Sequence, residues 1–526
     1  MKNFIRSRWV PLLAVILLII IRIPYLNYPF FWDESIPYAS AIHAMYLHGP
    51  SLLPSSLDPE LSRGHPLLLH FLASSWMKIS GPGRVPGHTF ALVIAIATLI
   101  YLYEAVRELF GSKAAIIALL FLGLQPIFVV QSIAVVPEMM VALFTIISLH
   151  TYATRRYLWA GLSLTALFFT KESGLVLGIV IGLHAATGLF DRNEPFGQRV
   201  RALSAVAIPT ILIASFFILQ KHTFGWYIFP YHEEIMHHKW PDFWFHIRRS
   251  SLATIFQGHF KYYLYMPLAL LAIVIAVRYK AYLYLTILLP IVAYGFIINN
   301  GGNGQFPQSV LFFTIFVATS LMAIYVYAYS FWPTHRPGRS FLLLAGLFLL
   351  LYLIFCAANF YVQRYSLVAQ CVLAALVAGW YSHVIKKLSW NWLYTGVAAC
   401  IIIVGFCAFR YDPDSSDVDM ASYQTAAMQL AEIRYMEQHH LQNATIGAGG
   451  YLCREHLKDA GCGYLDGAPF THVSWYIDAA TGYAIFDNVE PDSRYNDFLK
   501  DTSFHRVYLY EAQGLKAEIF KRNSLP

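Results

Sequence analysis

Long apolar runs limit the folds open to this chain more than any other feature. About thirteen runs are long enough, or nearly long enough, to cross a bilayer as a helix, which takes about 20 residues. They lie at roughly residues 9–24, 88–106, 114–131, 137–153, 157–170, 173–190, 202–220, 263–277, 281–298, 309–328, 341–359, 367–385 and 391–409. We therefore predict an α-helical polytopic membrane protein with about 13 transmembrane helices. Several runs between residues 114 and 170 are short, so half-helices or re-entrant segments are alternatives there.

The composition supports this class and argues against others. Charged residues make up 13% of the chain and hydrophobic residues 57%, whereas soluble domains contain about 25% charged residues. The formal net charge of +7 does not come from one basic stripe, so nucleic acid is not an expected partner. No G-x-x-x-x-G-K-[ST] loop occurs in the sequence, so nothing indicates an ATP-driven mechanism.

Lysine and arginine are unevenly distributed between successive connections. If the N-terminus is cytoplasmic, the N-terminal segment and the short connections on its side hold 16 Lys and Arg residues. The connections on the other side, before residue 410, hold 10 over far more residues. Because cytoplasmic loops are enriched in these residues, we predict a cytoplasmic N-terminus. The loops at about 25–87 and 221–262, and the tail after Arg410, are then extracytoplasmic.

The chain divides at about residue 410. Residues 1–409 are the predicted membrane module, and residues 410–526 are polar and long enough to form a small extracytoplasmic α/β domain. In that tail, residues 422–440 carry apolar side chains at helical spacing. Short apolar segments typical of strands lie at residues 444–448, 483–487 and 506–510.

Two cysteines stand apart from the four in apolar runs. Cys453 and Cys462 lie in the polar tail, nine positions apart. Compartments outside the cytoplasm are usually oxidising. We predict a disulfide between them, and two free thiols are the alternative.

Unusual polar residues gather at the outer ends of the predicted helices. They are Asp33 and Glu34 at the start of the first outer loop, Glu138, Lys171 with Glu172, and Arg364 with Tyr365. A charge at membrane depth costs about 2.5–3.5 kcal/mol, so such residues usually face a cavity or a partner. Carboxylates beside a lysine and an arginine favour a cavity that binds an anion next to a base.

Each residue also has a simpler interpretation when it is taken alone. Asp33 and Glu34 are compatible with a solvated membrane interface. Glu138 follows a proline and suits the first turn of a helix. A lysine can extend its amine to the interface, and an arginine can anchor a helix end. Their occurrence together on one face favours function.

Histidines of the second outer loop raise the question of a metal. They are His222, His232, His237, His238, His246 and His259. Their spacing matches no zinc motif. We predict no metal site, and a divalent cation, although possible, has no support in the sequence. Solvated loop histidines are the preferred interpretation.

Five segments carry a resemblance to a known family. They read WDESIPYASAIHAMYLHG, RGHPLLLHFLA, VVPEMMVALF, FTKESGLVLG and VQRYSL, in that order, over about residues 30–370. In them the chain resembles the GT-C class of membrane glycosyltransferases, in the branch of the protein O-mannosyltransferases and the lipid A aminoarabinose transferase. The Asp-Glu pair that opens the first outer loop is the most specific part.

The resemblance implies an activity and roles for named residues. It implies an inverting glycosyltransferase with a polyprenyl-phosphate-sugar donor and an acceptor outside the cytoplasm. Asp33 would be the catalytic base and Glu138 a second carboxylate. Lys171, Arg364 and Tyr365 would bind the donor phosphate. The residues expected to support the site are Glu34, Tyr38, Arg63 and His65.

Residues 63–67 differ from the corresponding stretch of the aminoarabinose transferase, and the difference concerns the acceptor. The aminoarabinose transferase has Glu-Lys-Pro-Pro-Leu where this chain has Arg63, Gly64, His65, Pro66 and Leu67. This weakens lipid A as acceptor, and a polysaccharide, a glycolipid or a protein stays open. The expected location is a bacterial inner membrane. The rival hypothesis is a membrane transporter or lipid flippase, which would use the same charges as a substrate pathway.

Overall fold

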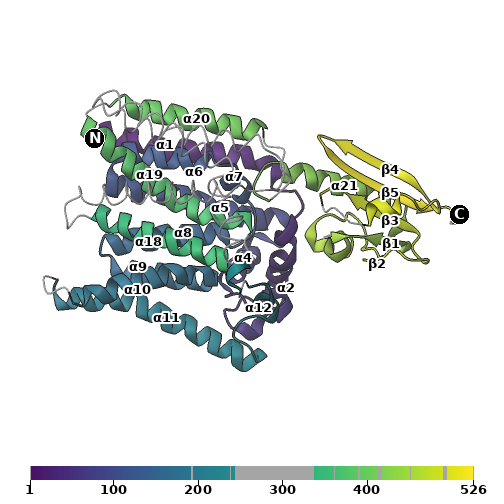
Figure 1. The fold of residues 1–526 in the computed structure, drawn as a ribbon, viewed down its shortest axis with the longest axis horizontal. Helices are drawn as coiled ribbons and strands as arrows, with labels where there is room; N and C mark the ends of the chain where they lie inside the picture. Colours follow the sequence, from purple (N-terminus) through teal and green to yellow (C-terminus); the bar gives the residue numbers. More distant parts are fainter. Residues whose placement is uncertain are drawn as a thin grey trace.

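Figure 1 shows a bundle of helices with a smaller, sheet-containing part at one end. The structure is a computed structural model. It describes residues 2–190, 194–236, 239–242, 337–359, 362–388, 391–411, 417–450, 452–489 and 494–524. Three predicted helices, at 263–277, 281–298 and 309–328, lie outside the described residues. The histidines His237, His238, His246 and His259 also lie outside them.

The bundle is built from the predicted apolar runs. Its helices are α1 (Lys2–Arg22), α5 (Arg84–Phe110), α6 (Ser112–Gly123), α7 (Pro126–Gln131), α8 (Glu138–Ala153), α9 (Tyr157–Thr170), α10 (Leu175–Gly188), α11 (Phe196–Phe224), α18 (Pro337–Ala358), α19 (Ser366–Leu388) and α20 (Leu393–Tyr411). In the described part, α5, α11, α18 and the segment from Gln363 into α19 are long and apolar enough to cross a membrane. The protein is therefore membrane-embedded.

One predicted helix is broken in the structure. The run at 114–131 forms α6, which ends at Gly123, and α7, which begins at Pro126. A proline inside a helix removes a backbone hydrogen bond and clashes with the preceding turn, so a helix restarts there more easily than it continues. The run is therefore two shorter helices, one of the alternatives that the sequence left open.

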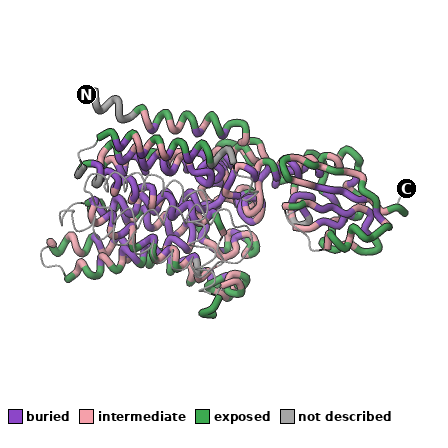
Figure 2. Tube along the Cα trace, turned by 45° about the horizontal axis from the view of Figure 1, so that its top comes forward, coloured by how far each residue is buried: buried purple, intermediate pink, exposed green. Residues whose placement is uncertain are grey.

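Burial follows the position of each helix in the bundle. Helix α8 packs against α5, α9 and α19, and almost all of its residues are buried. Helix α11 exposes large apolar side chains such as Ile208, Ile211 and Ile218. Figure 2 shows this pattern as a buried centre with exposed outer helices. Apolar side chains on the outer face of the bundle suit contact with lipid.

Short helices form the end of the bundle that faces the sheet. Between α1 and α5 these are η2 (Trp32–Glu34), η3 (Ser35–Ala39), α2 (Ser40–His48), η4 (Pro54–Ser56), α3 (Pro59–Ser62) and α4 (Leu68–Ser80). After α11 comes α12 (Pro230–Ile235). In Figure 1, α2 and α12 lie at this end, and the N-terminus lies at the other.

The tail contains a five-stranded sheet. Its strands are β1 (Thr445–Ala448), β2 (His472–Ser474), β3 (Tyr483–Asp487), β4 (Phe504–Ala512) and β5 (Leu515–Arg522), in the order β2-β1-β3-β5-β4. Strand β1 is parallel to both neighbours, and β5 is antiparallel to both of its own. Helix α21 (Ser422–Gln438) packs on the sheet through Ile433 and Met436. A short helix, α22 (Tyr495–Phe498), precedes β4.

The predicted disulfide is wrong. Cys462 is a buried free thiol in a short turn, Ala460–Cys462, and packs in the apolar core of the tail. Its backbone carbonyl accepts a hydrogen bond from the Phe30 amide at 3.0 Å. Cys462 therefore helps to join the tail to the loop after α1 rather than to close a loop within the tail.

Other contacts fix the tail against the bundle. The guanidinium of Arg22, fully buried at the end of α1, packs against the rings of Tyr25 and Tyr423, 4.9 and 4.8 Å from their centroids. It also donates to the Tyr423 hydroxyl. Arg84, at the start of α5, donates to the carbonyl of Gly463 at 2.7 Å. These contacts place the start of α21 and the turn at Gly463 beside the end of α1 and the start of α5.

Candidate active site

The adjacent carboxylates Asp33 and Glu34 point in different directions. Trp32, just before them, has a left-handed φ of 50°. Glu34 is buried, and its oxygens accept the amides of Val135 at 2.8 Å and Phe31 at 3.2 Å. Asp33 instead forms an ion pair with Arg364, and 25% of its side chain is exposed. Glu34 thus holds the loop, and Asp33 has the access that chemistry with a substrate needs.

Arg364 is the centre of a set of buried charges. It lies in the turn between α18 and α19 and is 3% exposed. Its Nη2 pairs with Asp33, its Nη1 donates to Asp417 Oδ2 at 2.9 Å, and its Nε lies 3.5 Å from Glu138 Oε1. Each nitrogen of the planar guanidinium therefore faces a different carboxylate.

Lys171 adds a second cation. Helix α9 ends at Thr170, and Lys171 turns into an extended conformation with φ −162°. Its Nζ donates to Glu138 Oε1 at 2.8 Å and lies 4.1 Å from the ring centroid of Tyr365. Glu138 is the first residue of α8, where the helix dipole favours a negative charge. Glu138 thus joins Lys171 to Arg364.

The remaining predicted residues surround this set. Tyr38 is buried with its ring stacked on His70, and burial raises the pKa of the Tyr38 hydroxyl. His65 Nδ1 lies 2.9 Å from Glu172 Oε2, next to Lys171 in the chain. The His65 ring also packs against His232, whose pKa burial lowers to about 4. These residues form one edge of the candidate site.

Arg63 shapes this edge through its backbone. It ends α3 in a left-handed conformation with φ 47°. Gly64 follows with φ 70°, and a Cβ atom there would come within 2.9 Å of the Trp226 ring. The turn thus brings His65 toward the site while it packs closely on the connection after α11.

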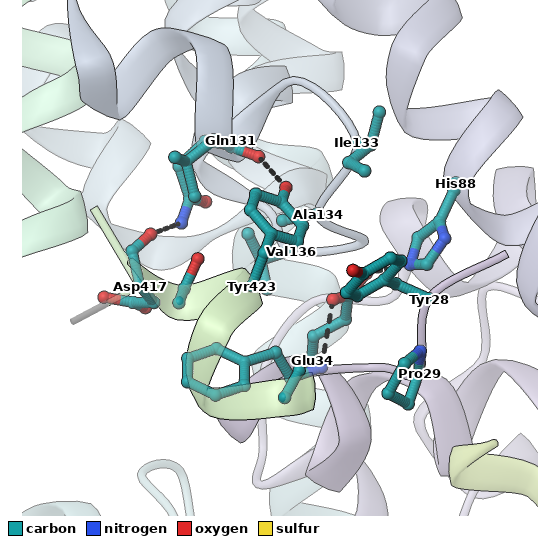
Figure 3. A pocket seen from close by; sticks show the side chains of 14 residues that line it. Tyr28, Pro29, Glu34, His88, Gln131, Ile133, Ala134, Val136, Asp417 and Tyr423 are labelled. Carbon is teal, nitrogen blue, oxygen red and sulfur yellow. Dashed lines mark hydrogen bonds and ion pairs between the residues drawn. The ribbon is translucent and has the colours of Figure 1, made fainter. Parts of the chain in front are cut away.

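Asp417 and Gln131 were not predicted from the sequence. Gln131 ends α7, and its Nε2 donates to the Asp417 backbone carbonyl at 2.7 Å. Both line a small pocket with Glu34, His88 and Tyr423 (Figure 3). The signal available for Asp417 was the acidic stretch DPDSSDVD, directly after the last apolar run. Nothing in it indicated that Asp417 is buried against Arg364.

The candidate site combines carboxylates with cations. Three carboxylates and two cations from separate parts of the chain meet where the bundle faces the tail. The cations can stabilise a phosphate, and the partly exposed Asp33 can accept a proton. Within the described ranges, no three His, Cys, Asp or Glu side chains group closely enough to hold a metal ion.

Comparisons with known proteins bear on the fold. Residues 64–224 match the family model for dolichyl-phosphate-mannose-protein mannosyltransferase. The whole fold is similar to the crystal structure of ArnT from Cupriavidus metallidurans bound to undecaprenyl phosphate. That match has a TM-score of 0.54 and 12% identity, and covers 98% of both chains. The match to the apo structure of the same protein has a TM-score of 0.53, with the same identity and coverage. A search of curated proteins finds no match.

The resemblance found in the motifs is thereby confirmed. A segment of the chain matches a mannosyltransferase model, and nearly the whole chain shares the fold of ArnT, a GT-C lipid A aminoarabinose transferase. The matched segment contains Glu138 and Lys171 and ends before Arg364. At 12% identity the structural likeness concerns the fold, so the roles of individual residues rest on the geometry described above.

Proposed function

We propose that this protein is a glycosyltransferase that moves a sugar from a polyprenyl-phosphate donor to an acceptor outside the cytoplasm. The observation that carries the proposal is the set formed by the partly exposed Asp33 and the buried Glu138, Lys171 and Arg364, which come from four separate segments. Two cations suit the phosphate of the donor, and a carboxylate suits the acceptor hydroxyl. The shared fold with a protein solved with undecaprenyl phosphate supports the same donor class.

The proposed reaction is one displacement with inversion. Asp33 takes the proton of the acceptor hydroxyl while the hydroxyl oxygen attacks the sugar carbon, opposite the phosphate. The bond from that carbon to the phosphate oxygen breaks, and its electron pair leaves with the polyprenyl phosphate. Arg364 and Lys171 stabilise the charge on this leaving group. Glu138 holds both cations in place, and Tyr365 packs against the Lys171 amine.

The proposed location is a bacterial inner membrane with the tail outside the cytoplasm. The uneven distribution of lysine and arginine supports this orientation. In Figure 1 the N-terminus lies at the end of the bundle away from the sheet, which also agrees with it. The site then opens on the outer face, where lipid-linked sugars and envelope acceptors meet.

A transfer assay with purified protein tests the proposal. The protein is incubated with a radiolabelled polyprenyl-phosphate sugar and an envelope extract, and the label is followed from the lipid fraction into other products. We expect transfer by the wild type and none above background by Arg364→Ala. Movement of labelled lipid across vesicles without any transfer would instead favour the transporter or flippase. Mass spectrometry of envelope glycolipids, polysaccharides and glycoproteins from a deletion strain would then identify the acceptor.

A further inference from the structure

Asp417 pairs with Arg364 at the nitrogen Nη1. Its Oδ2 accepts a hydrogen bond from Arg364 Nη1 at 2.9 Å, in buried surroundings. Its backbone carbonyl is held by Gln131 Nε2 at 2.7 Å. Figure 3 shows Asp417 and Gln131 at the pocket beside Tyr423. The residue belongs to the segment that leads into α21, so the tail itself contributes a charge to the site.

The charges of the site do not suit an additional anion. Asp33, Glu138 and Asp417 each face Arg364, and Lys171 is bound to Glu138. Two cations and three carboxylates give a net charge of −1. A phosphate that entered this site would find all three nitrogens of the Arg364 guanidinium already facing carboxylates. One carboxylate therefore has to release Arg364 when the phosphate binds.

Asp417 is the carboxylate whose release costs the site least. Glu138 also holds Lys171, so its departure would leave a buried amine without its partner. Asp33 is the proposed base and has to stay beside the reacting carbon. Among the described residues Asp417 pairs with no cation other than Arg364. Burial raises the pKa of Asp417 even though Arg364 opposes that change.

We infer that Asp417 is a placeholder for the donor phosphate: without donor, its carboxylate takes the place on Arg364 Nη1 that a phosphate oxygen takes in the complex. The inference rests on the proposed function. Asp417 acts through Arg364 and is a positioning residue. It keeps the buried guanidinium paired in the empty site, and it makes donor binding compete with a contact from the tail.

Equilibrium binding of polyprenyl phosphate to the full chain in detergent tests this inference. Asp417→Asn keeps the size of the side chain and removes its charge, so the ligand no longer competes with a carboxylate. We expect about fivefold or tighter binding, the lower end of the range for coupled sites. The matched control is Asp419→Asn. Asp419 is buried in the same segment, but its Oδ1 accepts the Ala421 amide at 2.8 Å. Its variant should bind like the wild type.

A variant that is partly unfolded would bind polyprenyl phosphate more weakly, so tighter binding by Asp417→Asn cannot result from damage to the structure. Unchanged or weaker binding by folded Asp417→Asn would overturn the inference and make Asp417 a support that orients Arg364. If that variant does not fold, Gln131→Leu decides. This change removes the contact that holds the Asp417 backbone and leaves all five charges in place, so it should also tighten binding, by a smaller factor. Unchanged or weaker binding by Gln131→Leu would likewise overturn the inference.

The wild type separates this inference from the proposed function. If wild-type protein fails to bind polyprenyl phosphate, the proposed function fails and the placeholder fails with it. If the wild type binds and neither variant binds more tightly, the placeholder alone is overturned.

Discussion

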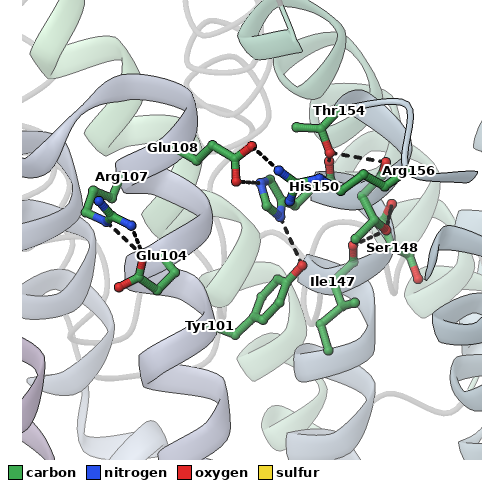
Figure 4. Close-up of polar contacts among 10 residues, drawn as sticks. Tyr101, Glu104, Arg107, Glu108, Ile147, Ser148, His150, Thr154 and Arg156 are labelled. Atoms are coloured by element: carbon green, nitrogen blue, oxygen red, sulfur yellow. Dashed lines mark hydrogen bonds and ion pairs between the residues drawn. The ribbon is translucent and has the colours of Figure 1, made fainter.

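Two clusters of charged side chains lie near opposite ends of α5 and differ in burial and charge balance. The cluster around Arg364 is on the side of the tail, where Arg84 begins α5. The other is centred on Glu108, 24 residues further along the helix, or about 36 Å at 1.5 Å per residue. Figure 4 shows its members. Glu108 accepts a bond from Arg156 Nη2 at 2.6 Å and lies 3.2 Å from His150 Nε2.

The difference indicates which cluster is better suited to a ligand. The side chains of Glu108 and Arg156 are 40% and 49% exposed, whereas those of Glu138 and Arg364 are 2% and 4% exposed. Exposed ion pairs contribute about 0–1 kcal/mol to the free energy of unfolding, and forming them removes little water from the charges. Burying an ion pair removes both charges from water, and the attraction between them often fails to offset this desolvation penalty. The cluster around Arg364 also has one carboxylate in excess of its cations, so it is poorly explained as a device for stability.

The largest expected effect concerns the base. Asp33→Asn should reduce the rate of sugar transfer by roughly 10²–10⁴-fold, because a general base is lost while the side-chain shape is kept. Binding of the donor should persist, since an anionic phosphate does not require a carboxylate next to it. Single-turnover transfer from a labelled donor measures this effect. Near-normal transfer by Asp33→Asn would remove Asp33 from the chemistry, and loss of transfer in Glu34→Gln alone would move the role there.

The second effect concerns the shape of the arginine. Arg364→Lys keeps the charge but cannot face three carboxylates with three nitrogens in one plane. We expect kcat/KM for the donor to fall by about ten- to hundredfold, in line with the ~1.5–3 kcal/mol of a hydrogen bond to a charged group. The thermal stability of the variant should stay near that of the wild type. Activity equal to that of the wild type would show that the fork geometry has no role.

The third effect concerns stability rather than chemistry. Glu34→Gln replaces one of two acceptor oxygens by an amide donor, opposite the amides of Val135 and Phe31. We expect the free energy of unfolding to fall by about 1–3 kcal/mol, because one of these backbone amides loses its acceptor. Denaturant unfolding measures this loss. Asp33→Asn serves as the matched comparison and should be more stable than Glu34→Gln. The reverse order would contradict the division of roles between the two carboxylates.

The smallest effect is expected at the far cluster. Glu108→Gln removes an exposed ion pair with Arg156 and should change the free energy of unfolding by no more than about 1 kcal/mol. Sugar transfer should be unchanged, since Glu108 lies about 36 Å along α5 from Arg84, which begins the helix on the side of the site. A loss of transfer comparable to that of Asp33→Asn would abolish the distinction between the two clusters.

The sequence predicted the helices of the described bundle well because their signal is local. Apolar runs of spanning length and basic connections lie within short stretches, so α5, α8, α9 and α19 begin and end within a few residues of prediction. The break before Pro126 was only an open alternative, and the strands β2 and β5 were not predicted. Strand β2 has only three residues, and β5 shows no strict alternation of buried and exposed positions.

The site was partly predictable for the same reason. Asp33, Glu138, Lys171 and Arg364 stand out as charges at the ends of apolar runs, and the structure brings them together. Asp417 lies among several aspartates in a polar segment, so only its burial against Arg364 distinguishes it. The exposure of Cys462 could not be read from its neighbours either, because its burial depends on packing with residues distant in the chain.

The central claim is that the buried cluster around Arg364 and Lys171 binds the phosphate of a lipid-linked sugar. Its most direct test compares the affinity of the purified wild type for a polyprenyl phosphate and for the uncharged polyprenol with the same chain. We predict that the phosphate binds at least about tenfold more tightly, a difference of about 1.4 kcal/mol. The difference should disappear in Arg364→Ala and persist in Arg156→Ala. Equal affinity of the wild type for the two lipids would contradict the account.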